Sequence, residues 1–287
     1  MAGGICLMEN IKYDMVIIGH MSKDIVIIDG KTEVCSGGSA YYAAFPPKYL
    51  KVNFLVITKL ALEDYYLLED FWKNAIPVFP IADKYSTVME DRFKKKDGYV
   101  RKSTVISSAS PFKLSEIPVE KAQIFYLAGL MYGEIPENLI VRLEERGRVA
   151  LDIQVFLRHI TAKGEIVLRD WKLKRKYLPY IFYLKADMEE AKILTGLDKI
   201  DSIAKYIISL GVKEVIITDK NGVHVSDSRN TYFYPFEAYS IEGRQGRGDT
   251  CFSSYLGARI SKSIEESAKI SAEITGRKLK KKGPYSG

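Results

Sequence analysis

The sequence predicts an α/β protein with a mainly parallel central sheet, helices on both faces, and a small β lid. From about residue 123 onward, short apolar runs alternate with helical patterns, which is typical of a parallel sheet covered by helices. Earlier in the chain, Asp29-Gly30 and Asp97-Gly98 each lie between β-rich segments and favour tight hairpins. The 287 residues are 47% hydrophobic, which is enough for a sizeable core.

The N-terminal half predicts strands and hairpins with short helices between them. The expected elements are a buried strand at 13–19, a hairpin at 25–35, a helix at 39–45, a strand at 52–58, a helix at 62–74 and a hairpin at 85–107. We expect Pro46-Pro47 to end the first helix. The two hairpins are expected to form a small antiparallel sheet of their own.

The C-terminal half supplies most of the parallel sheet. The expected strands lie at 123–128, 148–152, 181–185 and 214–218, and the expected helices at 136–146, 187–195 and 201–210. An antiparallel stretch at 222–234 and two helices at 249–261 and 264–282 complete the chain. Neither a repeat nor a linker is evident, so we expect a single domain over 13–284, with lid segments at about 24–36 and 85–107 inserted.

Composition excludes several classes of protein. Three scattered cysteines are too few for a disulfide framework and indicate a reducing compartment. Residues 1–10 lack the features of a secretory signal, and the longest apolar run, at 124–132, is best explained as a buried strand. The net charge of +7 suits a polyanionic ligand, while the basic cluster at 277–282 fits a solvated helix end. We therefore expect a cytoplasmic protein with neither a membrane nor a nucleic acid as partner.

The Gly-rich segment at 243–249 predicts a phosphate site. Gly243, Gly246 and Gly248 precede Asp249, and a run with helical spacing follows. Backbone N–H groups at the start of a helix, together with the helix dipole, favour a bound phosphate. An ordinary turn with an Asp N-cap explains the local pattern equally well. Arg247-Gly248-Asp249 is also the adhesion tripeptide, but the cysteine usage and the apolar continuation argue against a secreted loop.

Three further acids fall where predicted strands end or in the lid. Asp24 lies beyond the first strand, Asp152 ends the strand at 148–152, and Asp187 follows the strand at 181–185. Each alone is commonly a surface turn residue. Open α/β sheets bind ligands at the carboxyl ends of their strands, so their shared placement favours one common site with the 243–249 segment.

Four motifs follow one another along the chain: Gly19-His-Met-Ser-Lys-Asp24, Gly37-Gly38-Ser-Ala, Lys185-Ala-Asp187-Met-Glu-Glu190 and Gly246-Arg-Gly-Asp249. In this order they resemble the ribokinase-like (pfkB) family of carbohydrate kinases, and the resemblance covers about residues 15–284. A fifth segment, Thr218-Asp-Lys-Asn-Gly222, matches the nucleotide-side loop of that family loosely. The resemblance implies a ribokinase-like fold.

The resemblance also implies roles for individual residues. Asp249 would be the catalytic base, and the main chain of Gly246, Arg247 and Gly248 would hold the transferred γ-phosphoryl group of ATP. Glu190 with Asp187 would organise Mg²⁺ through water. Thr218, Gly222 and the 264–276 helix would flank the adenine. The predicted acceptor site comprises Asp24, Gly37, Gly38, Arg101, Asp152 and Gln154.

The chain departs from the family pattern at several positions. Arg247 replaces an alanine of the signature, Gly243 replaces an aspartate, and Asp187 replaces an asparagine. Tyr42 stands where an asparagine usually follows the Gly-Gly pair, which argues against recognition of a furanose. The nucleotide-side loop lacks one of the family's usual glycines, so the sequence does not determine which phosphate donor is used.

We therefore predict an ATP- and Mg²⁺-dependent kinase that phosphorylates a hydroxyl of a small sugar or cyclitol. Inositol ranks first because residues 151–158 resemble a segment of the myo-inositol kinase branch. A nucleoside kinase of the same family is the first alternative. A catalytically inactive, sugar-binding regulator is the second. Exposed hairpin edges make a homodimer through the lid an additional expectation.

Overall fold

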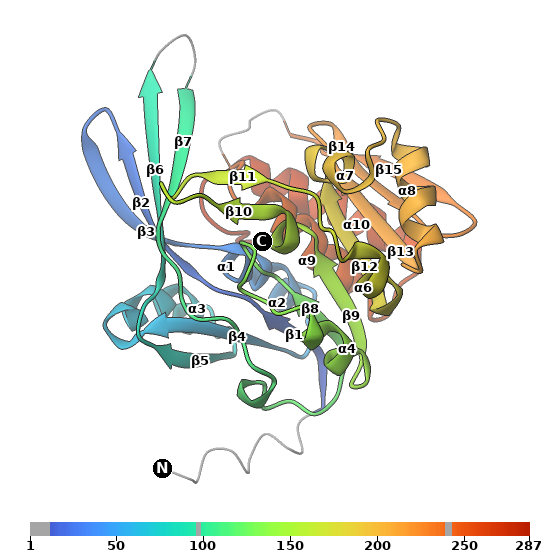
Figure 1. Cartoon of the computed structure of the whole chain (residues 1–287), viewed down its shortest axis with the longest axis horizontal. Coiled ribbons are helices and arrows are strands. Elements are labelled where there is room, and N and C mark those ends of the chain that lie inside the picture. Colours follow the sequence, from blue (N-terminus) through green and yellow to red (C-terminus); the bar gives the residue numbers. More distant parts are fainter. Residues whose placement is uncertain (1–11, 96–98, 239–242) are drawn as a thin grey trace.

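The structure is a computed structural model that describes residues 12–95, 99–238 and 243–287, with the side chains of 93–102 outside this description. Within these residues the chain forms a large sheet, a small sheet beside it, and a short hairpin of β10 (Arg158–Ile160) and β11 (Ile166–Leu168). Figure 1 shows the small sheet projecting from one side of the larger layered body.

The large sheet is mainly parallel, as the sequence predicts. Its first seven strands in chain order pair in parallel, and an antiparallel extension is added at one edge. From edge to edge the strands are β15 (Thr231–Pro235), β14 (Gly222–Ser226), β13 (Glu214–Thr218), β12 (Ile181–Asp187), β9 (Arg148–Asp152), β8 (Ala122–Leu127), β1 (Tyr13–Ile18), β4 (Phe54–Ala61) and β5 (Val78–Asp83).

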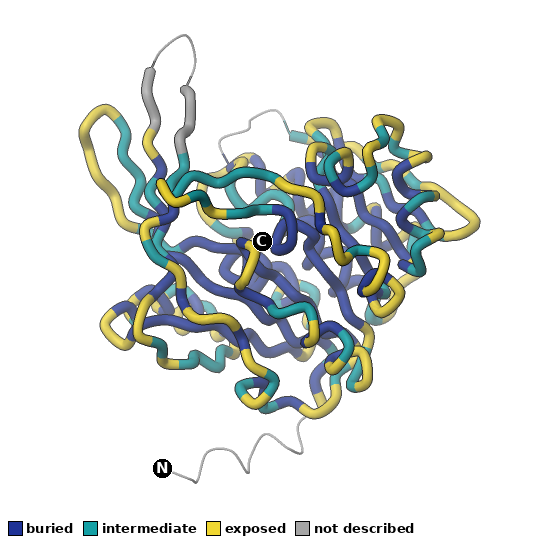
Figure 2. The backbone as a smooth tube through the Cα atoms, viewed as in Figure 1, coloured by how far each residue is buried: buried dark blue, intermediate teal, exposed yellow. Residues whose placement is uncertain are grey.

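Helices cover both faces of this sheet. The helices are α1 (Ser39–Ala43), α2 (Phe45–Tyr49), α3 (Glu69–Lys73), α4 (Asn138–Glu144), α5 (Gln154–Leu157), α6 (Lys174–Tyr177), α7 (Met188–Thr195), α8 (Ile200–Ser209), α9 (Arg247–Arg259) and α10 (Ile264–Leu279), with 3₁₀ turns at Leu62–Leu68, Leu114–Glu116 and Leu178–Tyr180. Alternate strand residues enter two cores: Ile17 packs with Phe252 of α9, whereas Ile18 packs with Leu139 of α4. The strands are therefore buried on both sides, as Figure 2 shows.

The two predicted hairpins form the small sheet, in the order β3-β2-β6-β7. The first is β2 (Ser22–Ile28) with β3 (Lys31–Gly37), and the second is β6 (Thr87–Lys95) with β7 (Tyr99–Ser107). The expectation of a fully antiparallel sheet is wrong, because β2 and β6 pair in parallel. β2 follows β1 and β6 follows β5, which are both strands of the large parallel sheet. β2 and β6 therefore leave the same edge of that sheet in the same direction. The Asp97-Gly98 turn lies outside the described residues.

Other differences from prediction have local causes. Pro46 and Pro47 do not end a helix but lie in the first turn of α2, where a missing N–H leaves no hydrogen bond unmade. The helix expected at 62–74 begins as a 3₁₀ turn and becomes α3 only at Glu69, and Ala61 supplies no side-chain cap. The sequence did not predict β5, which contains Pro80 and tolerates it as an edge strand.

His20 joins the large sheet to the second hairpin. It follows β1, and its Nδ1 lies 3.0 Å from Thr87 Oγ1, which also accepts from the amide of Ala109 at 3.1 Å. Burial lowers the pKa of His20 although Glu134 opposes this, so the ring is neutral. The assigned tautomer donates from Nε2 to Ser110 O at 3.2 Å. Both ends of the β6–β7 hairpin are therefore fixed to the end of β1.

Membrane insertion finds no support in the helices. Among the described residues, none of the helices combines the length and the apolar character needed to cross a bilayer.

Candidate functional site

A buried cluster of charges lies where β9 and β12 end. Lys185 and Asp152 are register neighbours in these parallel strands, and Lys185 Nζ lies 3.0 Å from Asp152 Oδ2. The same Nζ lies 3.6 Å from Glu190 Oε2, while Arg158 Nη2 lies 3.3 Å from Glu190 Oε1. Asp152, Lys185 and Glu190 are all buried. The fold therefore keeps two cations and two acids together beneath the carboxyl edge of the sheet.

Burial and mutual attraction set the protonation of this cluster. Burial alone would lower the pKa of Lys185, but Asp152 and Glu190 outweigh it and raise that pKa. Burial raises the pKa of Asp152 to about 7, with Lys185 opposing. Burial also acts to raise the pKa of Glu190, but Lys185 and Arg158 more than compensate and lower it. Lys185, Arg158 and Glu190 are therefore charged at neutral pH.

Asp187 and Glu190 form the cap of α7. Asp187 Oδ1 accepts from the amide of Glu190 and Glu190 Oε2 accepts from the amide of Asp187, both at 2.8 Å. Glu190 is thus held by an amide and two cations, which does not fit direct ligation of a metal ion. The described residues hold no group of three or more His, Cys, Asp or Glu placed around one ion.

The Gly-rich turn (residues 243–249) leads into α9. Gly246 is the N-cap, with φ of 71°, and a Cβ there would overlap the ring of Tyr42. A Cβ at Gly248 would crowd Lys185 Nζ. The amide of Arg247 reaches Arg244 O at 3.3 Å. The first N–H groups of a helix have no intrahelical acceptors, so this turn presents bare backbone donors beside a buried ammonium.

Asp249 lies in the first turn of α9 and is half-buried. Its Oδ1 is buried and, among the described residues, has no hydrogen-bond partner. Burial raises the pKa of this carboxyl group, with Lys185 and then Ser39 opposing. Its surroundings are therefore polar side chains rather than packed hydrocarbon. A carboxylate with a raised pKa and an open oxygen is equipped to accept a proton.

Asp24, Gly37 and Gly38 meet at the base of the small sheet. The buried Asp24 accepts from Ser22 Oγ at 2.5 Å and from Gln245 Nε2 at 2.7 Å. Gly37 is the register neighbour of Ser22, and a Cβ on Gly37 would overlap the Asp24 carboxylate. Gly38 has φ of 93° and faces the backbone at His20. Gln245 thus links this acid to the Gly-rich turn, 221 residues away in sequence.

The remaining predicted acceptor residues differ in placement. Gln154 is buried and donates to Ser39 Oγ at 2.5 Å and to Gly129 O at 2.9 Å, so it fixes the side chain that faces Asp249. Asp152 is fully buried under Lys185. The side chain of Arg101 lies outside the described residues.

Comparison with known proteins identifies the family. A sequence profile described as pfkB family carbohydrate kinase matches residues 97–286. The chain belongs to the pfkB family of carbohydrate kinases. This confirms the resemblance that the motifs indicated, and this pfkB-family kinase is a phosphotransferase with an alcohol group as acceptor. The enzyme prediction is thereby favoured over an inactive regulator.

Three relatives extend the comparison. A sulfate complex of a pyrophosphate-dependent kinase in the ribokinase family is 35% identical, with a TM-score of 0.88 and coverage of 95% of this chain and 97% of that one. A pyrophosphate-dependent kinase of the ribokinase family bound to a pyrophosphate analog and myo-inositol is 34% identical, with a TM-score of 0.87 and the same coverages. Cytidine kinase of Thermococcus kodakarensis is 26% identical, covering 95% of this chain and 98% of the relative. The α/β fold prediction is confirmed.

In the donor-side loop (residues 218–222) of this pfkB-family kinase, two backbone amides are hydrogen-bonded within the loop itself. Asp219 Oδ1 accepts from the amides of Asn221 at 2.7 Å and Gly222 at 2.9 Å. Gly222 begins β14, and a Cβ there would overlap Tyr234 O, so packing against β15 already requires glycine. Thr218 is the register neighbour of Asp187 and has a buried hydroxyl without a partner among the described residues.

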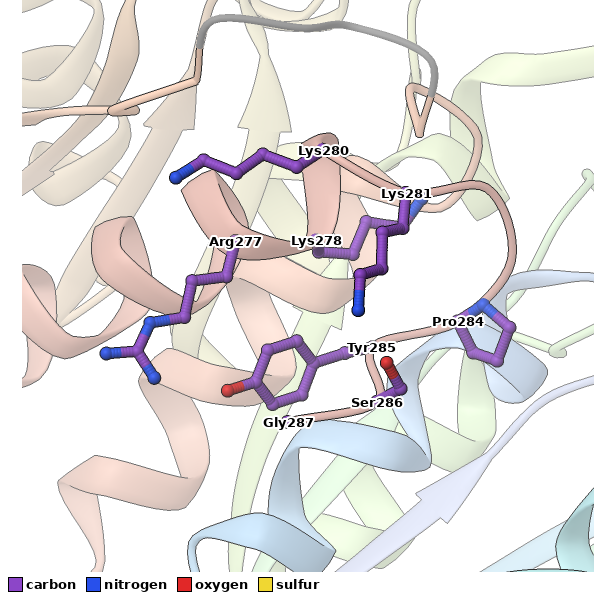
Figure 3. Close-up of a pocket in the computed structure, with 8 residues that line it drawn as sticks. All are labelled: Arg277, Lys278, Lys280, Lys281, Pro284, Tyr285, Ser286 and Gly287. Atoms are coloured by element: carbon purple, nitrogen blue, oxygen red, sulfur yellow. The ribbon is translucent and has the colours of Figure 1, made fainter.

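Two cavities lie along α10, near the predicted adenine side. One, of about 350 Å³, is lined by Tyr234, Pro235, Glu237, Lys269, Ala272, Glu273, Arg277 and Lys280. The other, of about 200 Å³, lies at the end of α10 and is drawn in Figure 3. Both linings combine charged side chains with apolar ones, Tyr234 and Pro235 in the larger cavity and Pro284 and Tyr285 in the smaller.

Sequence reasoning gave no role to Lys185, Arg158, Ser39, Gln245 or Lys278. Lys185 carries a detectable signal, because a lysine in an apolar buried strand needs an acidic partner. The other four meet the site through contacts between distant segments, and their local sequence carries no comparable signal.

Proposed function

We propose that this kinase transfers the terminal phosphoryl group of pyrophosphate to one hydroxyl of a cyclitol, with myo-inositol as the first candidate. The observation that carries the chemistry is the buried carboxylate oxygen of Asp249, unpaired among the described residues, in the first turn of α9 at the end of the Gly-rich turn. A base and a cluster of main-chain donors then lie side by side, which is the arrangement that phosphoryl transfer requires.

The transfer step balances as follows. The acceptor hydroxyl oxygen forms a new bond to the terminal phosphorus of the donor, and the bond from that phosphorus to the bridging oxygen breaks. The hydroxyl proton passes to Asp249 Oδ1, and orthophosphate leaves. Burial raises the pKa of Asp249, which makes its carboxylate a stronger proton acceptor than an exposed one. A positioned base contributes on the order of 100- to 10,000-fold to the rate.

Charge on the transferred group is stabilised by fixed dipoles and cations. The amides at the start of α9 add the partial positive charge of a helix N-terminus. Lys185 lies beneath Gly248, and the guanidinium of Arg247 has no ion-pair partner among the described residues. Such donors need no reorientation as charge develops, and each is commonly worth roughly 3 kcal/mol. The small sheet is proposed as a lid that excludes water, the competing acceptor.

Three features favour pyrophosphate over the ATP that the family resemblance implies. Asp219 accepts from the amides of Asn221 and Gly222 in the donor-side loop, so these amides are not free to contact a nucleotide, and it places a negative charge there. Arg247 adds a cation within the signature itself. The relatives at 34% and 35% identity are pyrophosphate-dependent. Pyrophosphate has no nucleobase, so its affinity must come from charge alone, and this site supplies charge.

The acceptor proposal depends on Asp24. An ionised carboxylate can accept hydrogen bonds from two hydroxyls at once, which suits a polyol. In this structure the Asp24 carboxylate accepts from the hydroxyl of Ser22 and from the side-chain amide of Gln245. Tyr42, in place of an asparagine, packs against Gly246 and argues against a furanose. The relative that binds myo-inositol supports a cyclitol.

A nucleoside kinase is the second candidate. The cytidine kinase relative covers nearly all of this chain at 26% identity, and it supports a nucleoside acceptor. Mg²⁺ is part of either proposal, with Asp187 as the contact through water. When bound, the ion would offset charge on the donor phosphates.

A matrix of acceptors and donors tests the proposal. Purified enzyme is supplied with myo-inositol, ribose or cytidine, each with pyrophosphate or ATP, and the phosphomonoester product is followed by ³¹P NMR. We expect the highest kcat/KM for myo-inositol with pyrophosphate, and a product rate lower by at least roughly 100-fold in the Asp249→Asn variant. Faster phosphorylation of cytidine with ATP would instead establish the nucleoside kinase.

A further inference from the structure

Lys278 is a buried cation that no part of the transfer step uses. It lies in the last turn of α10 and is 2% exposed. Its Nζ donates hydrogen bonds to the carbonyl oxygens of Gly243 and Gln245, the first residues of the Gly-rich turn. The ring of Tyr42 lies 5.3 Å from Nζ. In Figure 3 its side chain runs away from those of Arg277 and Lys280.

These contacts act on the orientation of the donors in the turn. The carbonyl of Gln245 and the N–H of Gly246 belong to one planar peptide unit. Fixing the oxygen therefore fixes the direction of the N–H. A second anchor comes from the amide of Gly243, which donates to Leu279 O at 3.0 Å. The ring of Tyr42 packs against Gly246 and also contacts Lys278 Nζ, so α1 and α10 both hold the turn.

The same turn reaches the acceptor end. The carbonyl of Gln245 accepts from Lys278, and its side-chain amide donates to Asp24 Oδ2 at 2.7 Å. One residue therefore connects the C-terminal helix, the phosphate side and the acid proposed to bind the acceptor. A shift of the Gln245 backbone would move both ends of the reaction path.

Only a charged side chain of this length fits the position. A buried ammonium is costly unless its donors are paired, and two carbonyls with an aromatic face supply that pairing. Burial lowers the pKa of Lys278 to about 8, with Asp249 opposing, so the group is mostly protonated at neutral pH. The neighbouring Lys280 and Lys281 are exposed. A general attraction for anions would be served by those side chains without a buried one.

We propose that Lys278 is a positioning residue that aims the Gly246 amide at the transferred phosphoryl group and holds Gln245 in register with Asp24. This rests on the proposed function, because it assigns the aim of donors to that reaction. Misplacement of a reacting group by about 1 Å costs roughly 100-fold in rate. Loss of the ammonium should therefore lower kcat far more than it raises the acceptor KM.

Three variants test the proposal, with thermal unfolding measured for each. Lys278→Met keeps the length and removes the charge, Lys278→Ala opens a space, and Lys280→Met removes an exposed charge from the same helix end. We expect Lys278→Met to lose roughly 10- to 100-fold in kcat, with a smaller rise in the acceptor KM through Gln245 and Asp24. Lys280→Met should match wild type. n-Propylammonium chloride should restore part of the Lys278→Ala rate, and tetramethylammonium chloride, which has no N–H donors, should not.

The outcomes separate this inference from the proposed function. Wild-type enzyme that phosphorylates no acceptor refutes the function itself. Active wild type with an unchanged kcat in folded Lys278→Met overturns the positioning role. If Lys278→Met does not fold, the Lys278→Ala rescue decides: equal rates in the two ammonium salts would also overturn it.

Discussion

The Gly-rich turn and the donor-side loop belong to the same carboxyl edge of the sheet, yet they use main-chain amides in opposite ways. In the turn, Asp249 keeps an open carboxylate oxygen beside the first amides of α9. In the loop, Asp219 accepts from the amides of Asn221 and Gly222 and leaves neither free. The turn is the segment proposed to receive a phosphate, whereas the loop has satisfied two of its own donors.

The charges follow the same division. Lys185 lies against Gly248 and Lys278 is bonded to the turn at Gly243, so the turn is flanked by buried cations. The loop carries the carboxylate of Asp219 beside the ammonium of Lys220, and its net charge is close to zero. The proposed phosphate site therefore depends on the turn and not on the loop. The proposed preference for pyrophosphate rests on this contrast.

The largest expected effect is at the open carboxylate. Asp249→Asn keeps the shape and removes the base, so kcat should fall on the order of 100- to 10,000-fold while the unfolding temperature stays close to wild type. Steady-state kinetics with myo-inositol and pyrophosphate measure this. An Asp249→Asn variant that retains wild-type kcat would refute the base.

The pH dependence of the reaction rate tests the role of Asp249 in a second way. Burial raises the pKa of Asp249, and the active form is the deprotonated one. The rate should therefore fall with decreasing pH through a midpoint above the ordinary carboxylate range. A profile that stays flat down to pH 4 would contradict this.

The sequence predicts the turn better than it predicts what holds the turn. Gly246 and Asp249 lie in one short segment of the chain, and the physical reason for each is local: an amide-exposing turn and an acid at a helix start. Lys185 and Asp152 become partners only through the register of two strands. Lys278 meets Gly243 across 35 residues. Such contacts depend on how elements pack, which periodicity does not encode.

The fold follows the same pattern. The parallel strands other than β5 were predictable because they are short apolar runs, as for β8 and β9. Pro46 illustrates the limit: proline both ends helices and begins them, and the packing of Phe45 on Phe71, with ring centroids 5.9 Å apart, accompanies the second outcome. Local propensity leaves both outcomes open.

A smaller effect is expected from the cation in the signature. Arg247→Ala removes a guanidinium that has no ion-pair partner among the described residues, so little stability should be lost. Hydrogen bonds to charged groups contribute about 1.5–3 kcal/mol, which corresponds to a rise of roughly 10- to 100-fold in the pyrophosphate KM. Arg244→Ala, on the exposed side of the turn, is the matched control. Equal effects of the two substitutions would show that only general charge matters.

The smallest effect on kinetics is expected from substitutions at Asp219. They also test most directly the contrast between the Gly-rich turn and the donor-side loop. Asp219→Asn keeps the side-chain oxygen that caps the loop and removes its charge, whereas Asp219→Gly also frees the amides of Asn221 and Gly222. Removing the charge should shift kcat/KM toward ATP by about 1 kcal/mol, or roughly fivefold. Freeing the amides should add to that shift. Because both donors are measured on the same variant, any loss of folded protein cancels in the ratio. If neither substitution moves the ratio, the closed loop does not set the donor, and the preference has to come from the Gly-rich turn and Arg247 alone.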